Sequence, residues 1–107
     1  MARLASLVTG LSPTIVEREL RQRLKFRGVT ITDSLEAGAL TAYGPSAQRA
    51  VLAAKAGMDV LLCSARDVSQ GQTTVAAVAD AVANHELNPG RFGIALRRVL
   101  ALRDSLG

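Results

Sequence analysis

The chain has 107 residues, of which 49% are hydrophobic and 21% charged, with 13 basic against 9 acidic side chains. This length suits one domain, because domains typically run from about 50 to 200 residues, and the apolar content excludes a disordered tail. No apolar run approaches the roughly 20 residues of a membrane helix, and Leu4 to Val8 is too short for a secretion signal. We expect one core-forming domain over residues 1–107, cytoplasmic and without membrane contact.

The basic excess does not indicate a nucleic-acid-binding protein. A basic surface gains affinity for nucleic acid by releasing counterions, but the arginines here are dispersed, and the aromatic residues are only Phe26, Tyr43 and Phe92. Platforms for stacking bases are therefore almost lacking, and we expect the arginines on solvated helix faces. The single cysteine, Cys63, has no His or Cys neighbour at ligand spacing, so the sequence predicts no disulfide, metal site or cofactor.

The first expected helix begins at Ser12, as the N-cap, with Pro13 at the first helical position. Val16, Leu20 and Leu24 recur every four residues and predict an amphipathic helix that ends near Leu24. After Gly28 the residues Val29 to Thr32 are all β-branched, which predicts a short strand ending at Asp33.

A loop is expected from Asp33 to Pro45, with one helical turn around Leu35 to Leu40. Ser46 to Ala56 predicts a second helix, with Ala47, Ala50, Val51 and Ala54 on one face and Gly57 as its stop. Met58 to Cys63 is almost continuously apolar, which is typical of a parallel strand buried on both faces.

A second loop, Ser64 to Gln72, is expected to precede a third helix that ends near Asn84. Its apolar positions are spaced three and four apart and comprise Val75, Val78, Ala79 and Val82. Asn88-Pro89-Gly90 marks the start of a last helix. The apolar positions of that helix are Phe92, Ala95, Val99, Leu102 and Leu106.

This alternation of helices and strands favours an α/β fold with parallel strands. Two parallel strands give each other only one neighbour, which leaves backbone donors and acceptors exposed at both outer edges. We therefore expect part of a larger sheet, which is either a fragment of a longer α/β fold or is completed by self-association or by a partner chain.

The stretch from Leu24 to Ala39 resembles the sequence around the nucleophile of glycoside hydrolase family 3. The pattern of that family, roughly G-F-x-G-V-V-hydrophobic-[ST]-D-[DSA]-L-x-M-x-A, is met at Phe26, Gly28, Val29, Thr32, Asp33, Ser34, Leu35 and Ala39. Further similarity lies at Leu11 to Pro13, Ala53 to Leu62 and Asn88 to Leu102. The resemblance covers about residues 11–106.

The resemblance implies a partial (β/α) barrel of the TIM type, with two parallel strands and four to five helices. It also implies hydrolysis of terminal β-linked sugars, of the β-N-acetylhexosaminidase or β-glucosidase type, with Asp33 as the nucleophile and a carbohydrate as substrate once the barrel is completed. Barrel enzymes place catalytic groups at the carboxyl ends of strands, where Asp33 is expected. Spacing alone instead favours Asp33 as a cap that accepts from the N–H of Leu35 or Glu36.

The second catalytic group is not found in the sequence. The resemblance implies an acid/base on a histidine-containing loop earlier in the barrel, or a glutamate from a following domain, and neither motif is present. His85 is expected to be an exposed loop residue, and Glu36 is the only carboxylate near Asp33. Ala37 stands where the family usually has a methionine that lines the sugar site.

Two further positions are expected to be structural. Asp59 matches a family position but starts a strand, at the end opposite to catalysis, and Cys63 is expected to be a small buried filler. The sequence identifies no substrate-binding residue and leaves enzyme activity open. The resemblance implies the nucleophile-bearing part of a retaining glycosidase, inactive alone; the alternative is a non-catalytic module that complements a partner chain.

Overall fold

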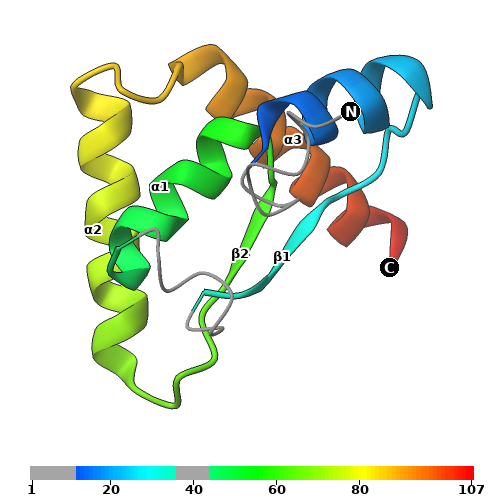
Figure 1. Cartoon of the computed structure of the whole chain (residues 1–107). Coiled ribbons are helices and arrows are strands. Elements are labelled where there is room, and N and C mark those ends of the chain that lie inside the picture. Colours follow the sequence, from blue (N-terminus) through cyan, green and yellow to red (C-terminus); the bar gives the residue numbers. More distant parts are fainter. Residues whose placement is uncertain (1–11, 36–43) are drawn as a thin grey trace.

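The computed structural model describes residues 12–35 and 44–107. Its elements follow the predicted order (Figure 1), and in sequence they are η3 (Thr14–Arg23), β1 (Ile31–Ser34), α1 (Ser46–Ala56), β2 (Val60–Leu62), α2 (Val68–Ala83) and α3 (Pro89–Ser105). Within the described residues, β1 and β2 form a two-stranded parallel sheet. The α/β fold with parallel strands is confirmed, with four helices among the residues described. The helical turn expected around Leu35 to Leu40 falls almost entirely outside them.

The first helix begins where the sequence predicts. The Ser12 hydroxyl accepts a hydrogen bond from the N–H of Ile15 at 3.3 Å, as an N-cap does, and Val16 is buried. The helix is of the π type rather than an α-helix, and near its end Leu24 donates its N–H to the carbonyl of Glu19 at 2.9 Å. Leu24 itself is exposed, so the predicted apolar face does not reach it.

Strand β1 begins two residues later than expected, at Ile31 rather than Val29. The strand also runs on to Ser34, so Asp33 lies inside it and not directly after it. The reason for the later start lies in Thr30, whose N–H donates to the carboxylate of Asp59 at 3.0 Å. Because this side chain occupies the amide of Thr30, the pairing of the two strands starts at Ile31, opposite Val60.

Helix α1 has the predicted bounds and ends at Gly57. Gly57 has a φ of +107°, and its N–H donates to the carbonyls of Ala53 and Ala54 in the last turn, a helix end that glycine favours because it has no Cβ. The alanines buried in this helix are Ala50, Ala53 and Ala56. The buried face is thus rotated from the predicted one, which included Ala47, Val51 and Ala54.

Strand β2 is shorter than predicted and is not buried on both faces. Val60 and Leu61 are half-buried, while Ile31 and Leu62 keep 57% and 37% of their surface exposed. Each strand has one strand neighbour among the described residues. The two-sided burial predicted for this strand is therefore wrong for the described residues, because burial on both faces needs further layers or strands.

Helix α2 begins at Val68, inside the stretch predicted as a loop. Asp67 caps it by accepting from the N–H of Ser69 at 2.9 Å, and hydrogen bonds from the side chain and the backbone of Ser69 hold the pKa of Asp67 below its usual value. Thr74 and Ala81 are buried in this helix, whereas Val75, expected on the apolar face, is exposed.

Helix α3 starts as predicted, with Pro89 at its first position. The side chain of Asn88 accepts from the N–H groups of Gly90 and Arg91 at 2.8 and 3.3 Å. None of its residues is buried, so its predicted apolar face is only partly covered. None of the helices in residues 12–35 and 44–107 combines the length and apolar character needed to cross a membrane.

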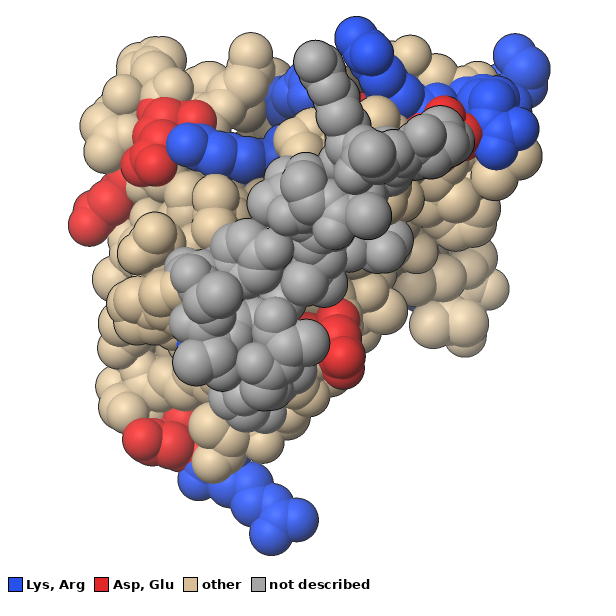
Figure 2. Space-filling view, in the orientation of Figure 1, with Lys and Arg blue, Asp and Glu red and all other residues tan. Residues whose placement is uncertain are grey.

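The arginines follow the predicted solvated pattern only in part. In the view of Figure 2, basic side chains lie along the upper edge of the molecule, in the region of η3 and the turn after it. Arg23 and Arg27, in this part of the chain, are exposed. The prediction is wrong for Arg21 and Arg98, whose side chains are 6% and 27% exposed, and for Arg49, which is half-buried. These three bind acidic or carbonyl groups.

Candidate active site at the carboxyl ends of the strands

Asp33 lies near the carboxyl end of β1 with its side chain exposed. One carboxylate oxygen, Oδ1, accepts a hydrogen bond from the N–H of Ser34 at 2.8 Å. The N–H of Leu35 donates instead to the carbonyl of Leu62 at 3.0 Å, so it does not take part in the alternative cap at Asp33. Glu36, the other predicted donor and the only carboxylate near Asp33 in the sequence, lies outside the described residues, as does Ala37.

The last residue of β1 meets the segment that follows β2 beside Asp33. The hydroxyl oxygens of Ser34 and Ser64 are 2.8 Å apart, which links the carboxyl ends of β1 and β2. The segment after β2 is also tied to α2, because the N–H of Ala65 donates to the side-chain oxygen of Gln70 at 3.0 Å. This edge of the sheet is therefore held by polar contacts on the β2 side.

Arg49 of α1 fixes the other side of the same edge. Its guanidinium donates to the carbonyl of Leu35 at 2.6 Å and to the carbonyl of Gly44 at 2.5 Å. The sequence reasoning missed this residue because its partners are backbone carbonyls, which carry no sequence signal. Arg49 thus anchors the backbone directly after the strand that carries Asp33.

A hollow of about 370 Å³ lies between η3 and β1 and includes Asp33 in its wall. Its lining is otherwise apolar or carries a hydroxyl group, as at Leu20, Phe26 and Ile31 on one hand and Thr32 on the other. Asp33 is the one ionisable residue among those that line it. The described residues that line the hollow do not supply a set of polar groups that would hold a sugar. No substrate-binding residue is therefore assigned.

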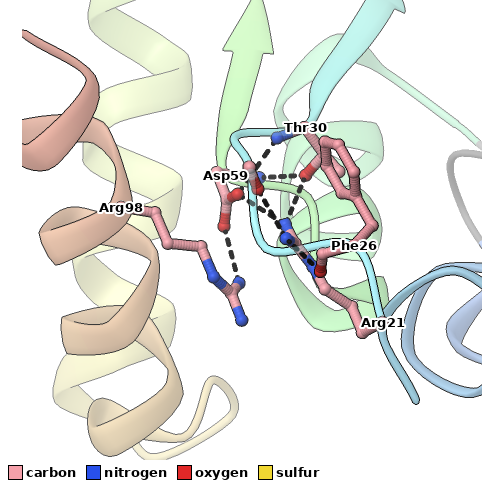
Figure 3. Close-up of polar contacts among 6 residues, drawn as sticks. Arg21, Phe26, Thr30, Asp59 and Arg98 are labelled. Atoms are coloured by element: carbon pink, nitrogen blue, oxygen red, sulfur yellow. Dashed lines mark hydrogen bonds and ion pairs between the residues drawn. The ribbon is translucent and has the colours of Figure 1, made fainter. Parts of the chain in front are cut away.

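A second polar cluster lies at the opposite end of the strands, around Asp59 (Figure 3). The Asp59 side chain has no exposed surface, and its two oxygens accept from Arg21 at 2.6 Å and from Arg98 at 3.1 Å. Arg21 also donates to the carbonyl of Gly28 at 2.5 Å, and its guanidinium lies 5.3 Å from the centre of the Phe26 ring. The cluster joins η3, the start of the sheet and α3, which agrees with the structural role predicted for Asp59.

The sequence signal for this cluster was present but incomplete. An aspartate at the start of an apolar strand requires a paired cation if it is buried, and the sequence does not say which of the dispersed arginines supplies it. Only the tertiary structure brings together Arg21 and Arg98, which lie 38 and 39 residues from Asp59.

The remaining candidate residues stand apart from Asp33. His85 is exposed, with a φ of +64°, in the segment between α2 and α3, as the sequence predicts. Cys63 is a free cysteine, half-buried rather than fully buried. No group of three or more His, Cys, Asp or Glu side chains in residues 12–35 and 44–107 is placed to hold a metal ion.

Comparison with known proteins decides the family. The profile of the glycosyl hydrolase family 3 N-terminal domain matches residues 5–102. The chain belongs to glycoside hydrolase family 3. The family resemblance carried by the motif around Asp33 is therefore confirmed.

Two curated relatives of this family 3 chain are named as hydrolases. An uncharacterized secreted glycosyl hydrolase of Arthroderma benhamiae is 42% identical over 102 residues, which are 95% of this chain and 29% of the relative. Beta-hexosaminidase A of Pseudoalteromonas piscicida is 25% identical over 101 residues, which are 90% of this chain and 17% of the relative. The chain thus spans less than a third of either relative.

Solved family 3 structures share the fold. A fungal multi-domain family 3 beta-N-acetylglucosaminidase superposes with a TM-score of 0.85 at 28% identity, over 92% of this chain and 12% of the fungal one. The beta-N-acetylglucosaminidase of Thermotoga maritima superposes with a TM-score of 0.79 at 22% identity, over 90% of this chain and 21% of that one. The second likeness supports the fold alone.

Proposed function

We propose that this chain is the nucleophile-bearing segment of a retaining family 3 glycoside hydrolase of the β-N-acetylhexosaminidase type, with Asp33 as the nucleophile. The observation that carries the proposal is an exposed carboxylate at the carboxyl end of a parallel strand. Barrel enzymes gather their catalytic groups at that end of their strands. The segment would then be part of a (β/α) barrel of the TIM type, whose other strands complete the site.

The proposed chemistry is a double displacement. A carboxylate oxygen of Asp33 attacks the anomeric carbon while an acid gives a proton to the leaving glycosidic oxygen, and the acid then acts as a base as water hydrolyses the glycosyl ester. The N–H of Ser34 holds Oδ1, so Oδ2 would be the attacking atom. The acid has to lie about 5 to 5.5 Å from the nucleophile, and we assign it to the remainder of the barrel.

We further propose that these 107 residues do not turn over a glycoside by themselves. Positioning and preorganised electrostatics supply a large share of catalysis, and the segment carrying Asp33 holds no acid partner among its described residues. The missing strands would come from the rest of a longer polypeptide, from a second copy or from a partner chain. The cytoplasmic location remains a prediction.

The test is complementation. The chain is assayed with a chromogenic β-N-acetylglucosaminide and with a β-glucoside. It is assayed alone and after coexpression with a Pseudoalteromonas beta-hexosaminidase from which the matching segment has been deleted. We expect no turnover by the chain alone and turnover by the complemented assembly. Asp33→Ala should abolish it, while Asp104→Asn, at an exposed aspartate of α3, should retain it. Light scattering records the mass of each species.

The alternative is a non-catalytic module that completes a partner, which the exposed Ile31 and Leu62 of the incomplete sheet favour. It predicts a stable assembly of defined mass whose turnover does not change when Asp33 is replaced. Full activity of an Asp33→Ala assembly would therefore contradict the nucleophile and support this alternative.

A further inference from the structure

The pairing of β1 with β2 contains one extra residue next to Asp33. Ile31 pairs with Val60 and Ser34 pairs with Leu62, so β1 advances by three residues while β2 advances by two. Such a β-bulge places two residues of one strand opposite one of its partner and changes where the following side chains point.

The burial pattern along β1 shows the effect of the bulge. Thr32 is buried and Asp33 exposed, as alternation in a strand requires. Leu35, the first residue after the strand, is 0% exposed although it lies two residues beyond the exposed Asp33. The extra residue between Ile31 and Ser34 thus lies in the stretch where the chain exposes the carboxylate of Asp33 and then buries Leu35 in the core.

Thr32 is linked by its side chain to the partner strand at this bulge. It is 7% exposed, and its hydroxyl oxygen accepts a hydrogen bond from the N–H of Leu62 at 2.9 Å. The carbonyl of Leu62 accepts from the N–H of Leu35 at 3.0 Å. Leu62 is thus hydrogen-bonded to residues on both sides of Asp33, to the Thr32 hydroxyl within β1 and to the Leu35 backbone just after it.

We propose that Thr32 is a positioning residue for Asp33, because its hydroxyl holds the bulge that presents the carboxylate at the open edge of the sheet. The catalytic meaning of this role rests on the proposed function of Asp33. Thr32 does not contact a reacting atom in this scheme. A valine of the same shape at this position would keep the packing but lose the acceptor for Leu62.

The test uses NMR on the 107-residue chain, with Thr32→Val, Thr32→Ser and, as a matched control, Thr73→Val at an exposed threonine of α2. The amide signal of Ser34 reports on the Asp33 carboxylate to which it donates. In Thr32→Val we expect that signal to shift and the Leu62 amide to exchange about five- to tenfold faster, as loss of one hydrogen bond implies. Thr32→Ser and Thr73→Val should keep both at their original values.

Two results would overturn the proposal. One is a folded Thr32→Val chain with unchanged Ser34 and Leu62 amides. The other is a folded Thr32→Ser chain that loses the Ser34 signal, and this second result decides the matter if the valine variant does not fold. In the complemented assembly, Thr32→Val should lower kcat with little change in KM, and Thr32→Ser should restore it. If Asp33→Ala assemblies stay active, the proposed function is wrong. The NMR result would still show whether Thr32 positions Asp33.

Discussion

At the scale of single residues, Asp59 joins several elements of the described chain. Its buried carboxylate accepts from Arg21, from Arg98 and from the backbone of Thr30. A buried charge is tolerated only when it is paired and hydrogen-bonded, and here every contact comes from a different part of the chain. The buried carboxylate of Asp59 therefore joins η3, the start of the sheet and α3, while Asp33, the candidate nucleophile, stays exposed.

Replacing Asp59 by asparagine should destabilise the chain by about 3–5 kcal/mol, because the change leaves the buried guanidinium of Arg21 without its counter-charge. Urea unfolding followed by circular dichroism measures this loss. Asp80→Asn, at an exposed aspartate of α2, is the matched control and should stay within about 0.5 kcal/mol of the original chain. A loss below about 1 kcal/mol for Asp59→Asn would contradict the pairing described here.

At the scale of elements, the connection from α1 to β2 depends on Gly57. The residue has a φ of +107°, and a Cβ there would meet the carboxylate oxygen Oε1 of Glu17 and lie 3.2 Å from a methyl carbon of Val16. Both neighbours belong to η3. A side chain at this position is therefore disfavoured both by the positive φ and by contact with η3. This turn delivers Asp59 to its arginine partners.

Gly57→Ala should lower the free energy of unfolding by about 1–2 kcal/mol from the left-handed backbone alone. Gly71→Ala is the contrasting variant, because a Cβ at that position in α2 meets nothing within 4 Å. It should raise stability by about 0.5–1 kcal/mol. Thermal and urea unfolding of the pair should give changes of opposite sign, and the same sign for both would refute this interpretation.

At the scale of the whole molecule, α3 is the least anchored element that the structure describes. None of its residues is buried, and a hollow of about 640 Å³ separates it from α1 and β2, with Leu61, Phe92 and Arg98 among the lining residues. Its polar link to the rest of the chain includes the bond from Arg98 to Asp59. An element with little apolar burial opens locally at low free-energy cost.

Arg98→Met should therefore speed hydrogen exchange in α3 by about tenfold or more, because a charge-assisted hydrogen bond is lost, while the amides of α1 keep their protection. Arg97→Met, at the exposed neighbouring arginine, should leave both helices unchanged. Equal acceleration in α1 and α3 would mean that the ion pair supports the whole fold rather than the attachment of α3.

The sequence predicted those features that depend on neighbouring residues. Asn88 and Pro89 start α3, and Ser46 to Gly57 bound α1, because caps and glycine stops act within one helical turn. The motif around Asp33 also sufficed to predict the family. The start of α2 was missed because Asp67, its cap, was interpreted as part of a loop.

Contacts between distant segments could not be inferred from the sequence and were decided only by the tertiary structure. Strand β1 starts at Ile31 because Asp59, 29 residues away, occupies the amide of Thr30. Arg21 and Arg98 are largely buried because they pair with the buried carboxylate of Asp59. The bulge between Ile31 and Ser34 depends on the register between two strands, which no local propensity specifies, since register follows from burial and long-range hydrogen bonding.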